Sequence, residues 1–358
     1  MKRSLFLFLA VALLLSACAP AATGTLPTQA PAPTNTPLPP AETLMNTPVP
    51  PTPTATPFPI LEPVITGSAT YDVRNTLTIT NNGPGSISKL EVTIATMRDY
   101  APYQSVISFV ATPEENLPRI VDNYGNEFAY YEFSDIAPGG SASIELNYRV
   151  VVNELHFDAT ACQGDVIWDF LGYENYINTA SSETHTIVDE IVAGGTDVCA
   201  SSRAFYDYVI NNLTYVAYNP DDVGSSGALR DGGGDCTEFA DLTIALHRVG
   251  GIPARFLEGV TYDPFSNGVV TNNESKHDWL EAYLPGIGWV PMDATWGQGT
   301  LTDRETYFAS MTDDHIIVTS GRNPEPLEGG HYYLWYYWWD DPTTVEDVET
   351  WTITRVVK

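Results

Sequence analysis

The sequence predicts an α+β protein in which a β-sandwich of about 100 residues precedes a mixed core of helices packed on a sheet. Three observations support this class. Short alternating strand patterns, separated by turns rich in Gly, Pro and Asn, run from residue 60 to 157. A helix pattern with apolar residues on nearly every side begins at Cys236. Two alternating segments joined by a Gly-rich turn follow it, at 276–284 and 289–295.

The first 59 residues are predicted to lie outside the globular fold. Residues 1–17 join a basic start to an apolar stretch of about 11 residues, which is too short to cross a bilayer and typical of an export signal. Leu-Ser-Ala before Cys18 resembles a lipoprotein cleavage site, with acylation of the Cys18 thiol; ordinary signal cleavage beside an incidental cysteine is the alternative. Residues 18–59 are rich in Pro and Thr and predict a disordered, extended linker. We therefore expect an exported protein, lipid-anchored on the outer face of the cell membrane or envelope.

Residues 60–157 are expected to form an immunoglobulin-like β-sandwich domain. Its clearest strand patterns are at 76–80, 90–94, 128–133 and 143–151. Nothing in this region clusters like a catalytic site. We therefore interpret it as a spacer or docking module.

The stretch 231–240 is predicted to place Cys236 at the start of a helix. Asp235 occupies the N-cap position and Glu238 follows three residues later, which is a capping-box pattern. A cysteine in the first turn experiences the positive end of the helix dipole and nearby free N–H groups, and both favour the thiolate. The glycines before it would let a substrate backbone approach closely. Cys236 is therefore the candidate nucleophile.

A general base and its partner are predicted on the downstream hairpin. A thiol nucleophile needs a neighbouring imidazole, and the imidazole needs an acceptor that fixes its tautomer. His277 and Asp293 can fill these roles if they share a face of the hairpin. Because side chains alternate between faces, this requires an odd-length loop or a bulge; a two-residue loop would separate them.

Four sequence blocks, in this order and with suitable gaps, resemble the bacterial transglutaminase-like domain over roughly residues 186–320. They are Gly-Asp-Cys at 234–236, Leu-His-Arg-Val-Gly-Gly-Ile-Pro-Ala-Arg-Phe-Leu-Glu-Gly at 246–259, His-Asp-Trp-Leu-Glu at 277–281 and Gly-Trp-Val-Pro-Met-Asp at 288–293. The resemblance implies a papain-like fold with Cys236 as nucleophile, His277 as base and acid, and Asp293 as orienting group. Asp278 departs from the family pattern, in which a small residue often follows the histidine. We expect its side chain to point away from the cleft.

The transglutaminase-like domain is expected to span 158–358, with the strands after Asp293 completing its sheet. Tyr215, Tyr218 and Trp279 are candidates for lining the cleft or assisting an oxyanion, although ordinary packing explains the tyrosines at least as well. The aromatic run at 332–339 is expected to pack in the core or at a sheet edge. A glycan-binding surface is the alternative for this run.

The remaining cysteines and histidines suggest no metal site and no cofactor. Cys162 and Cys199 are left after Cys18 and Cys236 are assigned, and in an exported chain they form either a disulfide or two buried thiols. Histidines other than His277, among them His315, lack partners at metal-ligand spacing. The carboxylates near 221–222 and 231–235 are interpreted as a solvated acidic loop in preference to a calcium loop.

The charge balance bears on partners. Sixteen basic and 45 acidic residues give a net charge of −29, which repels nucleic acid and anionic lipid. Membrane attachment would then come from acyl groups alone, and cationic peptides or amine-bearing wall polymers would be attracted.

The predicted activity is attack by Cys236 on amide bonds of peptides or proteins, through a thioacyl-enzyme, with hydrolysis favoured over transfer to an amine. One alternative is a non-catalytic surface module that uses a papain-like fold for binding. A second is an assembly role in which the thiol forms an intermolecular thioester.

Overall fold

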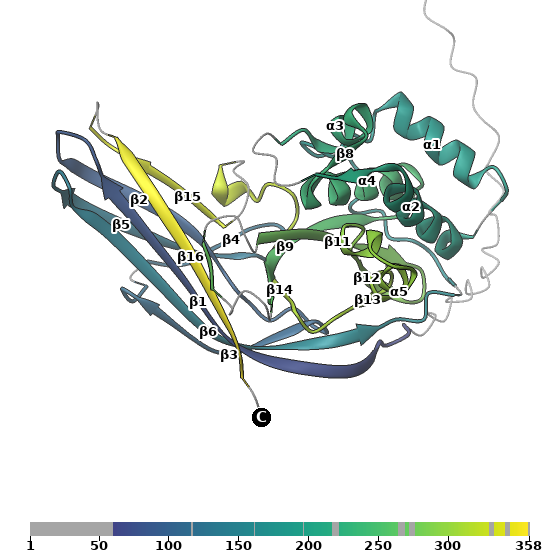
Figure 1. The fold of residues 1–358 in the computed structure, drawn as a ribbon, viewed down its shortest axis with the longest axis horizontal. Coiled ribbons are helices and arrows are strands. Elements are labelled where there is room, and N and C mark those ends of the chain that lie inside the picture. Colours follow the sequence, from purple (N-terminus) through teal and green to yellow (C-terminus); the bar gives the residue numbers. More distant parts are fainter. Residues whose placement is uncertain are drawn as a thin grey trace, which may run out of the picture. The chain divides into compact units, whose positions relative to one another are not determined.

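The computed structural model describes residues 60–115, 117–160, 162–195, 197–216, 222–263, 269–271, 276–328, 333–340 and 344–356. These residues belong to one compact unit (Figure 1). The predicted export signal 1–17, Cys18 and the linker 18–59 lie outside the described residues. Within the described part of the chain, no helix is both long enough and apolar enough to cross a bilayer.

Long strands from both ends of the unit build two sheets. The larger sheet has the order β10-β16-β1-β6-β13, with β3 also paired to β6: β1 (Val64–Asn81), β3 (Gln104–Thr112), β6 (Ser141–His156), β10 (Val269–Thr271), β13 (Ser310–Met311) and β16 (Val345–Val356). The second sheet has the order β15-β2-β5-β4: β2 (Ile87–Thr96), β4 (Ile120–Val121), β5 (Glu127–Ile136) and β15 (Leu334–Trp338). Side chains alternate between core and surface along β1, so that Tyr71, Val73 and Leu77 are buried. Both sheets contribute to one hydrophobic cluster. The immunoglobulin-like assignment of these sheets stays a prediction.

The two C-terminal strands do not complete the sheet of the second domain, which corrects that expectation; the domain boundary at 157/158 stays a prediction. Strand β16 pairs with β1 from Thr70↔Val356 to Asn81↔Val345, and β15 pairs with β2. The physical reason is that β1 and β2 each offer an edge whose N–H and C=O groups need partners. Trp351 of β16 is buried in the same cluster as Tyr71. The aromatic run therefore forms an edge strand, and most of its described side chains pack against that cluster.

The second half of the unit places helices against a four-stranded sheet of order β12-β11-β9-β14 (Figure 1). These strands are β9 (Ala254–Thr261), β11 (Lys276–Leu284), β12 (Gly288–Met292) and β14 (His315–Ser320). The helices are α1 (Ser182–Val192), α2 (Val198–Asn212), α3 (Gly224–Asp231), α4 (Cys236–Val249) and α5 (Leu301–Thr306), with short 3₁₀ turns at Trp296–Gln298 and Glu325–Leu327. Helix α4 contacts both β11 and β9, and nearly all of its residues are buried. This agrees with the apolar helix predicted after Cys236.

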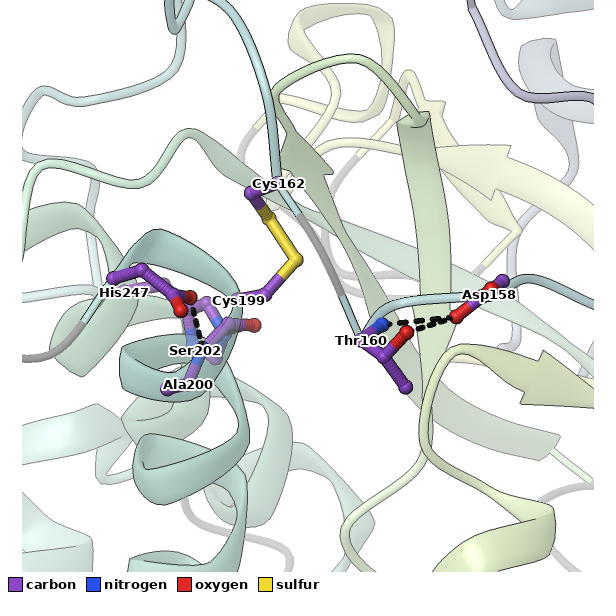
Figure 2. The surroundings of a disulfide bond; sticks show 8 residues. Asp158, Thr160, Cys162, Cys199, Ala200, Ser202 and His247 are labelled. Atoms are coloured by element: carbon purple, nitrogen blue, oxygen red, sulfur yellow. Dashed lines mark hydrogen bonds between the residues drawn. A yellow bond between two sulfur atoms is a disulfide. The ribbon is translucent and has the colours of Figure 1, made fainter.

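A disulfide joins the segment after the first sheets to helix α2. Cys162 and Cys199 are bonded, with a Cα–Cα separation of 5.6 Å (Figure 2). Further along α2, Ser202 Oγ lies 2.8 Å from His247 Nε2 of α4 (Figure 2). The bridge therefore ties Cys162 to a helix that is itself anchored on α4.

Candidate active site

Helix α4 begins with the predicted capping box. The Asp235 carboxylate accepts a hydrogen bond from the Thr237 N–H at 3.0 Å, and the Glu238 carboxylate accepts one from the Asp235 N–H at 3.0 Å. These bonds satisfy donors that the first helical turn would otherwise leave open. The capping box does not use the N–H of Cys236. That N–H is the group we expect to donate to an oxyanion.

The glycines before Cys236 serve the packing of the chain itself. Strand β7 (Thr214–Tyr215) pairs with β8 (Gly233–Gly234), and the Val216 N–H donates to Gly234 O at 2.9 Å. A Cβ on Gly233 would lie 2.4 Å from Thr214 O, which is closer than real Cβ contacts allow. The sequence predicts that these glycines admit a substrate backbone; in the structure the chain's own strand occupies the space next to Gly233.

The hairpin of β11 and β12 brings His277 and Asp293 together. Leu284 pairs with Gly288, so the loop contains three residues, 285–287. This odd-length loop meets the condition set from the sequence, because it places the two side chains on one face. His277 Nε2 lies 2.7 Å from Asp293 Oδ2. The imidazole therefore donates from Nε2, which leaves Nδ1 able to accept a proton.

Both oxygens of Asp293 are fixed. Its Oδ1 accepts hydrogen bonds from the N–H groups of Thr295 at 2.9 Å and Trp296 at 3.0 Å. Its Oδ2 faces two imidazoles, those of His277 and His315. Burial alone would raise the pKa of Asp293, but the charges and hydrogen bonds of the two histidines lower it well below its usual range. Asp293 is therefore ionised at neutral pH although it is fully buried.

Asp278 contacts the candidate nucleophile Cys236, so the expectation that it points away from the cleft is wrong. The Cys236 thiol lies 3.9 Å from Asp278 Oδ2, and Thr237 Oγ1 donates to the same oxygen at 2.7 Å. His277 bonds Asp293, and the next residue, Asp278, reaches Cys236 and Thr237 in the first turn of α4. The carboxylate thereby holds the start of the helix.

The thiol of Cys236 is surrounded by groups that favour its neutral form. Cys236 is only 8% exposed. Burial first, and then the charges of Asp278 and Asp235, raise the pKa of this thiol well above its ordinary value. These effects oppose the thiolate expected from the helix N-terminus. A neutral resting thiol needs a base that removes its proton during the attack.

The three residues predicted to line the cleft, Tyr215, Tyr218 and Trp279, differ in their surroundings. Tyr215 is 49% exposed, and burial first, then the charge of Cys236, raises its pKa. Trp279 is 1% exposed and its ring stacks on that of His277 at 5.8 Å, so it supports the imidazole from within the core. Tyr218 lies outside the described residues.

Sequence reasoning missed His315. Its Nε2 lies 3.2 Å from Asp293 Oδ2, because β14 pairs with β9 and so reaches the face that carries the hairpin residues. In the sequence, Asp314-His315 directly precedes Ile-Ile-Val at 316–318, which is a strand pattern. It gave no sign of which strand would lie alongside.

The side-chain nitrogen and oxygen atoms of His277, Asp293 and His315 lie as close together as the ligand atoms of a metal site. One ligand atom from each falls within 4.8 Å of the others. In the structure these atoms bond one another at 2.7 and 3.2 Å, so their hydrogen-bonding capacity is used without an ion. We assign no metal to them, and the expectation of no metal and no cofactor stays a prediction.

The buried helix with a cysteine at its first turn, packed on a sheet that carries a paired His and Asp, defines a papain-like fold. Residues 185–294 match the profile of the transglutaminase-like superfamily, so this chain contains a transglutaminase-like domain. A curated relative, the uncharacterized protein YebA of Bacillus subtilis (strain 168), is 32% identical over 120 residues. The match covers 32% of this chain and 16% of YebA, so it spans a small part of that protein.

Solved structures resemble the chain in fold. A proposed cysteine protease from Cytophaga hutchinsonii has a TM-score of 0.58 and 16% identity, covering 83% of this chain and 94% of that one. The periplasmic domain of TgpA from Pseudomonas aeruginosa has a TM-score of 0.37 and 14% identity, covering 66% and 92%. At 16% identity the first likeness concerns the fold alone, and with a TM-score below 0.5 the second supports no conclusion.

Proposed function

We propose that this protein is a cysteine-dependent enzyme that cleaves amide bonds of peptides or proteins through a thioacyl-enzyme, with water as the preferred acceptor. The observation that carries the proposal is the fixed pair of His277 on β11 and Asp293 directly after β12, where β11 packs against helix α4 and its Cys236. The match of residues 185–294 to the transglutaminase-like superfamily supports cysteine-dependent chemistry at this site.

The reaction uses each side chain in a defined way. His277 takes the Cys236 proton on Nδ1 as the sulfur bonds to the amide carbonyl carbon, because Nε2 is occupied by Asp293. The C–N bond then breaks, and His277 returns this proton to the leaving amine. In the second half, His277 removes a proton from water, the new oxygen attacks the thioester carbon, and the thiol leaves with that proton. An amine in place of water would give a new amide.

The proposal extends to location and partners. The lipoprotein-like Leu-Ser-Ala-Cys18 motif, followed by a Pro- and Thr-rich linker, supports an exported enzyme held to the membrane by lipid and reaching outward from it. The net charge of −29 favours cationic peptides or amine-bearing wall polymers over nucleic acid.

Acylation by p-nitrophenyl acetate tests the proposed chemistry on the full chain. Acid quenching followed by peptide mass spectrometry should show one acetyl group on Cys236. C236A should acquire none at this position, and H277A should slow acylation by about 100-fold or more, which is the usual scale for a lost general base. Adding a small primary amine would reveal how much acyl group transfers and how much is hydrolysed.

A non-catalytic binding module predicts a different result. Cys236 would then acylate no faster than an ordinary buried thiol, and H277A would acylate at the rate of the unmodified protein. That outcome would overturn the proposed function and direct the search to binding partners.

A further inference from the structure

A second histidine bonds the carboxylate of the candidate triad. His315 is the first residue of β14, and 3% of it is exposed. Its Nε2 lies 3.2 Å from Asp293 Oδ2, the same oxygen that accepts from His277. Its other ring nitrogen, Nδ1, lies 2.8 Å from Asp314 Oδ1. Both ring nitrogens of His315 therefore face carboxylate oxygens.

This arrangement requires His315 to be charged. A neutral imidazole has one N–H donor, and only the doubly protonated ring can donate to two carboxylates at once. Burial opposes the charge, but the hydrogen bonds to Asp293 and Asp314 outweigh it and raise the pKa of His315 to about 9. The titratable groups around the ring are Asp293, Asp314, His277 and Tyr307. Asp313, the residue before Asp314, pairs instead with Arg355, whose Nη2 lies 2.9 Å from its Oδ2.

The ring is also held sterically. Its centroid lies 4.6 Å from that of Trp296 and 5.1 Å from that of Trp279, with interplanar angles of 68° and 88°. Thr312 Oγ1 donates to the Asp314 oxygen that accepts from His315, which fixes the outer carboxylate. Rotation of His315 would break its contacts on both sides.

We propose that His315, held by Asp314, is a positioning residue that keeps Asp293 ionised and aimed at His277 throughout the reaction. This inference rests on the proposed function, because the role of His315 concerns the step in which His277 gives up its proton. Once His277 has given its proton to the leaving amine, it is neutral, and Asp293 would otherwise be a fully buried charge without a cation. The His315 cation compensates that charge at every stage. His315 lies beyond the matched segment 185–294, so the family match does not assign it.

The acylation rate of Cys236 by p-nitrophenyl acetate tests this role in the full chain. H315F keeps an aromatic ring but loses both donors, and we expect a rate at least about tenfold below that of the unmodified protein. H315Q keeps a donor toward Asp293 without the charge, and its rate should fall between the two. This partial rescue separates positioning from simple filling of space.

H247Q is the matched control, because His247 is also a buried histidine. Its ring bonds Ser202 Oγ of α2 and Thr243 O of α4, and burial lowers its pKa to about 4, so it is neutral. H247Q should lower the melting temperature and leave the acylation rate nearly unchanged. Equal slowing in H247Q and H315F would overturn the proposal, as would a folded H315F that acylates like the unmodified protein.

Nitrogen NMR of histidine-labelled protein gives an independent readout if H315F does not fold. The His315 signals, assigned by their loss in H315Q, should be those of a doubly protonated ring at pH 7, with a titration near pH 9. D314N should move that titration to lower pH. A neutral His315 at pH 7, or an unchanged titration in D314N, would overturn the inference. Failure of the proposed function looks different, because H277A would then acylate normally.

Discussion

Two adjacent residues of β11 have opposite effects on Cys236 in the proposed reaction. His277 is held by Asp293 and can take the thiol proton, whereas Asp278 places a negative charge 3.9 Å from the sulfur. At this separation, two unit negative charges repel each other by about 4 kcal/mol at an effective dielectric constant of 20, so the Asp278 carboxylate disfavours the thiolate of Cys236. The site therefore keeps Cys236 protonated until a base acts on it. A buried neutral thiol is also less exposed to oxidation than a thiolate.

Asp278→Asn should make Cys236 more reactive toward iodoacetamide at neutral pH. Asparagine still accepts from Thr237 Oγ1, but it carries no charge, so the pKa of the Cys236 thiol should fall. The pH at which alkylation is half-maximal should move down, with a rate at pH 7 at least about tenfold higher, the equivalent of one pKa unit. Peptide mass spectrometry across pH 6–10 measures the profile.

The control for this variant is Asp72→Asn, which makes the same change in net charge on the exposed pair with Arg149. It should leave the alkylation profile of Cys236 in place. A profile that is unchanged in D278N as well would show that burial alone sets the state of the thiol.

At the scale of elements, the loop before α4 is held in place by close backbone contact with strand β7. Strand β7 pairs with β8, and the N–H groups on either side of Tyr215, those of Thr214 and Val216, donate to the carbonyl oxygens of Gly232 and Gly234. Glycine is required at 233 because the Thr214 carbonyl oxygen occupies the space of a side chain. The position of Tyr215 is thus set by the same glycines that precede the nucleophile.

Gly233→Ala should displace β7 and destabilise the site. The added Cβ would lie 2.4 Å from a backbone oxygen, which a rotamer change cannot relieve. We expect a loss of about 1–3 kcal/mol in the free energy of unfolding, the usual cost of overpacking, together with slower acylation of Cys236. Gly194→Ala is the control, since a Cβ there meets nothing within 4 Å. Equal melting temperatures for the two variants would contradict this account.

Local features of the site could be predicted from the sequence, and features that depend on distant packing could not. The capping box at Asp235 and Glu238 and the hairpin of His277 and Asp293 lie within short stretches, where spacing fixes geometry. Asp278 was placed wrongly because the family pattern says nothing of a side chain that it does not contain. His315 was missed because its role depends on the pairing of β14 with β9.

The whole unit is joined through β14. Gln104 of β3 donates to Ile317 O at 2.9 Å and accepts from the Ile317 N–H at 2.8 Å. Asn126 does the same for Ser320, at 2.7 and 2.9 Å. These two side chains substitute for a neighbouring strand along the edge of β14. The first sheets therefore support the strand that carries His315, and the sequence offered no sign of this because the partners are 213 and 194 residues apart.

The double variant Gln104→Ala, Asn126→Ala should loosen β14 and weaken the site at a distance. Each substitution leaves buried backbone groups without partners, at a cost of about 1–3 kcal/mol per group. Amide hydrogen exchange at Ile317 and Ser320 should accelerate, and acylation of Cys236 should slow as His315 loses its fixed position. Asn147→Ala is the control, because Asn147 bonds Glu145 within its own strand β6. If exchange at β14 accelerates while acylation stays unchanged, the first sheets stabilise the fold without supporting the reaction; if both change, they are part of the machinery that holds the triad.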